Sequence, residues 1–200
     1  MPDPRRAAVA LVAAAALPVV LFAQVPAGGE FRINTYTIGG QDLTGRPAME
    51  ADGNFVVVWQ SFGQDGSALG IIGQRFAASG ARRGNEFAVN TYTTGDQFGA
   101  SVTVGRRGDF VVVWENSPQT GSGSTIRARR YDPTGAAIGG ELVVNTSTTG
   151  YVSRAQVAPA SDGRFVVTWT SPFSTSTELD IAAQVSVFVA ATLGLSLYGS

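Results

Sequence analysis

The stretch Asp52-Gly53-Asn54-Phe55-Val56-Val57-Val58-Trp59 decides the fold, because it occurs three times. It returns over residues 107–114 as Arg-Gly-Asp-Phe-Val-Val-Val-Trp, and over residues 162–169 as Asp-Gly-Arg-Phe-Val-Val-Thr-Trp. Its last residue is a tryptophan each time, and Trp59, Trp114 and Trp169 are 55 residues apart. A fixed period of this size is typical of repeat architectures, in which each unit buries its apolar surface against its neighbours.

Each copy is predicted to be a hairpin turn followed by a strand. Asp-Gly favours a two-residue type I′ turn, in which both central residues have positive φ, whereas Arg107-Gly108 leaves the second turn less defined. Both faces of the strand are apolar, which indicates burial on both sides. The residues expected to anchor the repeat are its glycines, phenylalanines and tryptophans: Gly53, Gly108, Gly163, Phe55, Phe110, Phe165, Trp59, Trp114 and Trp169.

Three further β-rich segments recur with the same period. They are the Glu-Phe segments (residues 30–37, 86–93 and 141–148), weaker apolar segments (47–49, 100–104 and 155–158), and strands at 71–76, 126–131 and 181–185. Four short antiparallel strands in each unit of about 55 residues predict an all-β fold of tandem four-stranded sheets, like the blades of a β-propeller. Three blades make a tight ring. Pairing of residues 30–37 with the third blade would close the ring, and a ring of three blades would still be too tight. The chain is therefore expected to be a fragment of a longer array, to assemble with copies of itself, or to form an open arc.

Composition excludes several kinds of chemistry. The 200 residues contain no Cys and no His, so disulfides, thiolate catalysis and the usual zinc ligands are absent, and no cofactor or metal site is indicated. A net charge of −1 gives no general attraction to nucleic acid. The small cluster Arg127, Arg129 and Arg130 is interpreted as charge on an edge strand that discourages pairing with other chains.

The two ends of the chain differ from the repeats. Residues 1–27 combine Arg5-Arg6, an apolar run and small residues, which predicts a signal peptide and a secreted, cell-surface or periplasmic location. The alternative is an uncleaved N-terminal anchor. Residues 28–185 form the expected repeat domain. Residues 186–200 are an apolar tail, too short to span a bilayer, interpreted as a cap on the last unit or as an altered terminus.

These motifs resemble a tandem repeat found in large exported bacterial proteins. The resemblance is carried by Glu-Phe-x-Val-Asn-Thr-Tyr-Thr, Asp-Gly-x-Phe-Val-Val-Val-Trp and Gln-Arg-Phe, and it covers residues 29 to about 184. It implies a propeller-like fold and an extracellular location, and it implies no reaction. The chain departs from the pattern in having three units and in lacking Gln-Arg-Phe in the third.

Few polar residues are candidates for chemistry. Asp65 lies in a loop that offers one carboxylate to calcium, and a plain turn explains it equally. Tyr36 and Tyr92 offer rings for stacking on sugars or for packing between blades. The carboxylates at recurring positions are better explained by structure than by catalysis: Asp52, Asp109, Asp162, Glu30, Glu86 and Glu141. Asp65 and Glu115 are candidates that do not recur, and each stands alone instead of in a cluster of unique polar residues.

The sequence therefore favours an exported, non-catalytic structural or binding repeat protein, with a glycan or a protein as its ligand and self-association as a way to complete a ring. The alternatives are a propeller-type glycan hydrolase, which needs converging carboxylates, and an orphan fragment of a larger surface repeat protein. The sequence identifies no catalytic, cofactor-binding or metal residue.

Overall fold

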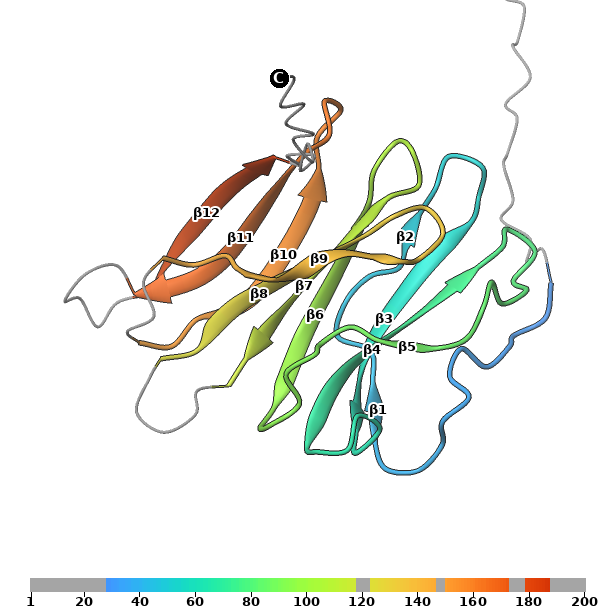
Figure 1. The fold of residues 1–200 in the computed structure, drawn as a ribbon, viewed down its shortest axis with the longest axis horizontal. Coiled ribbons are helices and arrows are strands. Elements are labelled where there is room, and N and C mark those ends of the chain that lie inside the picture. The colour runs from blue at the N-terminus through green and yellow to red at the C-terminus, as the bar shows by residue number, and fades with distance from the viewer. Residues whose placement is uncertain (1–27, 118–122, 147–149, 173–178, 188–200) are drawn as a thin grey trace, which may run out of the picture. The chain divides into compact units, whose positions relative to one another are not determined.

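The structure, a computed structural model, describes residues 28–117, 123–146, 150–172 and 179–187. The chain divides into two units, Met1–Glu30 and Phe31–Ser200. The expected signal peptide and residues 188–200 of the apolar tail lie outside the described residues. All regular structure described in the second unit is β-strand (Figure 1). No helix in the described ranges is long and apolar enough to cross a bilayer.

Three antiparallel sheets follow one another along the second unit. The first holds β1 (Gln41–Asp42), β2 (Ala48–Met49), β3 (Phe55–Phe62), β4 (Leu69–Phe76) and β5 (Phe87–Ala88), in the order β1-β3-β4-β5 with β2 also paired to β3. The second holds β6 (Gln97–Val104), β7 (Phe110–Asn116), β8 (Thr125–Tyr131) and β9 (Ala137–Val143) in chain order. The third holds β10 (Ser153–Pro159), β11 (Arg164–Pro172) and β12 (Leu179–Val187) in chain order.

The hairpin turn before each long strand contains one left-handed residue instead of two. Gly53 has a φ of +87°, and its N–H donates to the carbonyl of Glu50 over 3.0 Å. Asp52 does not have positive φ, so the prediction of a type I′ turn is wrong. Gly108 makes the same bond to the residue three positions earlier, with a φ of +82°. Because only the glycine needs left-handed backbone, Arg107 replaces Asp52 without changing the turn.

Neighbouring sheets pack face to face through apolar clusters. Side chains alternate along β7, so that Phe110, Val112 and Trp114 face the first sheet while Val111 and Val113 face the third. The all-β, tandem-sheet architecture is thereby confirmed, and its stacked sheets resemble propeller blades. The first cluster also contains Val56, Val58, Ile71, Val89, Ala100, Val102 and Tyr131, and the second also contains Ile126, Ala128, Val144, Val152, Ala155, Phe165, Val167, Trp169 and Ala182.

The Glu-Phe segment supplies the last strand of the preceding sheet. β5 pairs with β4, and β9 pairs with β8, so each segment closes one unit rather than opening the next. Residues 31–37 form no strand with the third sheet, contrary to the ring closure considered above. They lie against the first sheet, where the rings of Phe31 and Phe76 are 5.8 Å apart. Among the described residues, the third sheet consequently has three strands.

Burial of the central strand on both faces is confirmed for two of the three units. All residues from Val56 to Trp59 in β3, and from Phe110 to Trp114 in β7, are buried. In β11 the pattern alternates, with Phe165, Val167 and Trp169 buried and the residues between them half-buried. The face of the third sheet turned away from the second sheet is therefore less covered than its counterparts.

Candidate functional site

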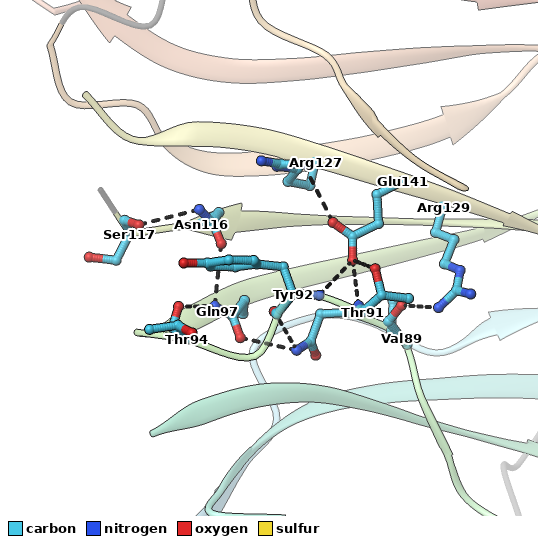
Figure 2. Close-up of polar contacts among 11 residues, drawn as sticks. Val89, Thr91, Tyr92, Thr94, Gln97, Asn116, Ser117, Arg127, Arg129 and Glu141 are labelled. Carbon is cyan, nitrogen blue, oxygen red and sulfur yellow. Dashed lines mark hydrogen bonds and ion pairs between the residues drawn. The ribbon is translucent and has the colours of Figure 1, made fainter. Parts of the chain in front are cut away.

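Two of the recurring glutamates, Glu86 and Glu141, hold neighbouring units together. Glu141 of β9 accepts hydrogen bonds from the backbone N–H of Thr91, from its hydroxyl at 2.7 Å, and from the N–H of Tyr92 at 3.3 Å (Figure 2). Its second oxygen lies 3.5 Å from Arg127 Nη1. Glu86 accepts from the N–H of Thr35 one unit earlier. Because the same contact occurs at two successive junctions, these carboxylates have a structural role and link neighbouring units by hydrogen bonds.

The arginines of β8 belong to the same junctions. β8 lies between β7 and β9, so the prediction of an edge strand is wrong. The guanidinium of Arg127 meets Glu141, and Arg129 donates to the carbonyl of Val89 over 2.7 Å, as Figure 2 shows. Arg129 also lies over the ring of Tyr131, 5.7 Å from its centroid. Arg129 therefore contacts the segment that follows β5, and Arg127 pairs with a carboxylate of its own sheet, so neither protects an edge.

A second set of junctions joins the sheets at the first strand of each unit. Gln60 accepts a hydrogen bond from the N–H of Gly99 at 3.4 Å, and Glu115, the equivalent residue of β7, accepts from the N–H of Ala155 at 3.3 Å. Glu115 is 4 % exposed. Burial raises the pKa of its carboxyl, and the amides of Ala155 and Arg154 and the charge of Arg154 lower it less. This unique acid is thus an interior residue of the junction, without a second carboxylate described as its hydrogen-bond partner.

We expect Glu115→Gln to raise the free energy of unfolding by about 1 kcal/mol at pH 7, because a neutral amide removes the cost of burying a charge and still accepts from Ala155. The pKa of Glu115 is higher in the folded chain than in the unfolded chain, so the folded chain holds the extra proton between these two values. Stability is therefore lost as pH rises through this window, and the advantage of the variant should vanish at lower pH. Urea unfolding of the parent and the variant from pH 4 to 8 measures this difference in the free energy of unfolding.

The reciprocal change Gln60→Glu is the control for this prediction. It places a charge at the equivalent, half-buried position beside Asp42, whose carboxylate accepts from Gln60 Nε2 over 3.3 Å. It should lower stability as pH rises. A Glu115→Gln protein less stable than the parent at pH 7 would contradict the prediction and show that Arg154 stabilises the charge.

The other acidic candidates cap turns. Asp52 Oδ1 accepts from the N–H of Asn54 at 3.1 Å, and Asp162 does the same for Arg164. The amide of Arg164 holds the pKa of Asp162 below its usual range. Asp65 Oδ1 accepts from the N–H of Ser67 at 3.2 Å. These contacts are those of turns, and Asp65 Oδ2 also accepts a hydrogen bond from Asn90 Nδ2 over 2.8 Å. In the described part of the chain no group of three or more acidic residues is arranged around a metal position.

The two tyrosine candidates differ in surroundings. Tyr92 is 37 % exposed beside the Glu141 junction. Tyr36 is half-buried and lines a cavity of about 520 Å³ together with Gln64, Gln74 and Glu86. The structure therefore places both rings at junctions between units, where they pack beside the polar contacts of the motif.

A larger cavity of about 740 Å³ lies where the β6–β7 and β10–β11 hairpins approach β8 and β9. Its charged lining is mostly basic and comprises Arg106, Arg107, Arg130, Arg164, Asp109 and Asp162. Arg164 pairs with Asp162 over 2.7 Å, and Asp109 raises the pKa of Arg130, although burial lowers it more. Arg106 and Arg107 are exposed at the hairpin tip. Sequence analysis missed this cavity, because its residues come from four separate segments.

The repeat anchors lie in the core and in turns. Two of them also line the larger cavity, and the others lie away from it and from the glutamate junctions. Trp59, Trp114 and Trp169 are buried, and Gly53, Gly108 and Gly163 occupy the hairpins. Gly163 and Phe165 also line the larger cavity. The anchors determine how the strands pack, and their apolar side chains and glycines carry no reactive groups.

Comparison with known proteins gives weak similarities. No family model and no curated protein matches the chain. Among solved structures, it is similar to the endo-arabinase from Bacteroides thetaiotaomicron VPI-5482, with 13% identity and a TM-score of 0.46 over 74% of this chain and 56% of that one. It is also similar to a thermostable family-43 glycoside hydrolase, with 11% identity and a TM-score of 0.47 over 70% and 49% of the two chains. The chain spans about half the length of these structures, and neither similarity bears on its activity.

Proposed function

We propose that this chain is an exported, non-catalytic structural or binding repeat protein. One observation carries the proposal: the recurring carboxylates Glu86 and Glu141 are occupied in holding one unit to the next. A glycosidase requires two carboxyl groups that converge on one bond, whereas these two belong to successive junctions of the array. Export rests on the composition of residues 1–27, which lie outside the described residues.

As a binding module, the protein offers the arginine-lined cavity as its ligand site. Four arginines against two aspartates give the lining an excess of positive charge. Guanidinium groups match the bidentate geometry of carboxylates, and the volume of the cavity falls in the range of ordinary ligand sites. These features favour an acidic glycan, whose uronate groups supply the complementary charge.

Affinity electrophoresis with polygalacturonate, an acidic polysaccharide, and starch, a neutral one, tests the proposal. We expect polygalacturonate alone to retard the protein, with the retardation weakening as salt rises. The double variant Arg106→Gln/Arg107→Gln should lose most of it, since both side chains are exposed and uninvolved in the core. Neither polysaccharide should release reducing ends.

Two outcomes count against the proposal. Release of reducing ends by the parent protein would overturn its non-catalytic part. Equal retardation of the parent and of the double variant would remove the cavity as the ligand site. Arg46→Gln serves as a charge control, because Arg46 is exposed and does not line the cavity.

A further inference from the structure

One isoleucine has a different environment in the third unit from its counterparts. Ile71, Ile126 and Ile181 occupy equivalent positions, facing Gln60, Glu115 and Thr170 on the preceding strand. Ile71 and Ile126 are 0% exposed, whereas Ile181 is 78% exposed. An aliphatic side chain buried in two units and open in the third indicates that, among the described residues, the covering element of the repeat is missing there.

The missing element is visible in the first two units. Val89 N–H donates to the carbonyl of Ile71 over 2.8 Å, and Asn90 Oδ1 accepts from the N–H of Ile71 over 2.7 Å. Val144 and Asn145 make the same two contacts with Ile126, at 2.8 and 2.7 Å. The Val-Asn pair of the Glu-Phe segment thus satisfies the N–H and the C=O that the isoleucine turns away from the preceding strand.

β12 has no such partner among the described residues. It is the outer strand of the third sheet. Val185, which lies four residues after Ile181 on the same side of the strand, is 62% exposed. By its register, Ile181 turns its N–H and C=O toward this outer edge, as Ile71 and Ile126 do. An edge of this kind is a template for one more antiparallel strand.

Residues 31–35 carry the sequence that this edge lacks. Phe31-Arg32-Ile33-Asn34-Thr35 corresponds to Phe87-Ala88-Val89-Asn90-Thr91. The Asn34 Nδ2 group donates to Tyr36 O at 2.7 Å and to Gln41 Oε1 at 3.2 Å, just as Asn90 Nδ2 donates to Tyr92 O and Gln97 Oε1. Within the described part of the chain, Asn34 Oδ1 accepts no hydrogen bond and residues 31–35 pair with no strand.

Residues 31–35 contact the first sheet in the way that residues 87–91 contact the second sheet. Phe31 packs on Phe76 of the first sheet, with ring centroids 5.8 Å apart, and Phe87 packs on Tyr131 of the second sheet, at 5.2 Å. An arginine donates to the segment in both cases: Arg82, in the connection between β4 and β5, to the carbonyl of Ile33, and Arg129 of β8 to that of Val89. Residues 31–35 therefore occupy the place of a last strand, and among the described residues they pair with no sheet.

We propose that residues 31–35 of a second copy of this chain dock as the fourth strand on β12, so that copies associate head to tail. Ile33 N–H would donate to the carbonyl of Ile181, and Asn34 Oδ1 would accept from its N–H. Leu142 of β9 lies opposite Ala128, which shows that the alanine equivalent to Ala183 admits a large apolar partner. Glu30 of the second copy would then stand at Thr146 as Glu141 stands at Thr91.

This contact joins two different surfaces, so it is heterologous and extends to a closed ring or to a filament. It goes beyond the proposed function, because it names the partner and the two surfaces and requires no ligand. A failure of glycan binding leaves it standing, and a failure of self-association leaves the glycan test unaffected.

Sedimentation velocity of the purified chain between about 1 and 100 μM tests the proposal. We expect the mass to rise with concentration, and Ile181→Lys and Asn34→Ala each to weaken association at least tenfold, which corresponds to about 1.4 kcal/mol. Ile138→Lys is the matched control, because Ile138 is an apolar residue of β9, 41% exposed and outside both surfaces, and this variant should associate as the parent does.

Mixing the two weakened variants separates this arrangement from others. Ile181→Lys protein keeps an intact residue 31–35 segment, and Asn34→Ala protein keeps an intact β12 edge, so an equimolar mixture should form a dimer and nothing larger. Tryptophan fluorescence confirms that each variant is folded. A parent that stays monomeric at all concentrations, variants that associate as the parent does, or a mixture that forms no dimer would each overturn the proposal.

Discussion

Trp114→Ala should lower the free energy of unfolding by about 4 kcal/mol, the scale observed when a large buried aromatic side chain is removed. Trp114 is 0% exposed and belongs to the cluster between the first and second sheets. Its Nε1 makes no hydrogen bond in the described part of the chain, so the loss comes from packing alone. Since a natural domain is stable by 5–15 kcal/mol, much of the fold's stability rests on this residue. Urea unfolding followed by far-UV circular dichroism measures the change.

Phe62→Ala is the matched control for Trp114→Ala, because Phe62 ends β3 and is 55% exposed. Its loss should change stability by less than about 1 kcal/mol. The same change at Trp169, which is 8% exposed in the last sheet, should cost less than at Trp114. A soluble Trp114→Ala protein with an unchanged urea midpoint would contradict burial of the central strand on both faces.

The repeat and its strands could be predicted from the sequence because they depend on local pattern. The strands expected at 71–76, 126–131 and 181–185 appear as β4, β8 and β12, and the weaker segments appear as β2, β6 and β10. Alternation of apolar residues and the fixed period are properties of neighbouring residues, and they persist in the folded chain.

The sheet that each strand joins could not be predicted in the same way. The Glu-Phe segment has the same local sequence whether it opens one unit or closes another, and only its hydrogen bonds to β4 and β8 assign it to the preceding sheet. The interpretation of Arg127, Arg129 and Arg130 as edge residues was wrong for the same reason. The local sequence does not show that β9 pairs with the outer side of β8.

The turn and the candidate site show two further limits. Asp-Gly indicated a turn correctly, but the choice of turn depends on how the flanking strands pair, and the glycine alone adopts positive φ. The recurrence of Glu86 and Glu141 indicated a structural role, and the partner of each, a backbone N–H about 50 residues earlier, carries no side-chain signal that a sequence would show.

Four side-chain hydrogen bonds converge on Asn90. It is 3% exposed. Its Oδ1 accepts from Ile71 N–H at 2.7 Å, and its Nδ2 lies 2.8 Å from Asp65 Oδ2 and 3.0 Å from both Tyr92 O and Gln97 Oε1. The contact with Tyr92 is local in sequence, and the other three contacts reach β4, the β3–β4 loop and β6.

Asn90→Ala is therefore expected to lower the free energy of unfolding by about 3 kcal/mol, because it leaves the buried N–H of Ile71 and the oxygen of Gln97 without partners, each at a cost of about 1–3 kcal/mol. Asn34→Ala, measured at a concentration where the chain is monomeric, is the matched control. Asn34 makes the same two Nδ2 contacts and lacks a described donor to its Oδ1, so its loss should cost about 1 kcal/mol. Hydrogen exchange should show the Ile71 amide losing protection in Asn90→Ala alone. Equal destabilisation by the two variants would mean that the bond to Ile71 adds nothing, which would also remove the basis for strand docking on Ile181.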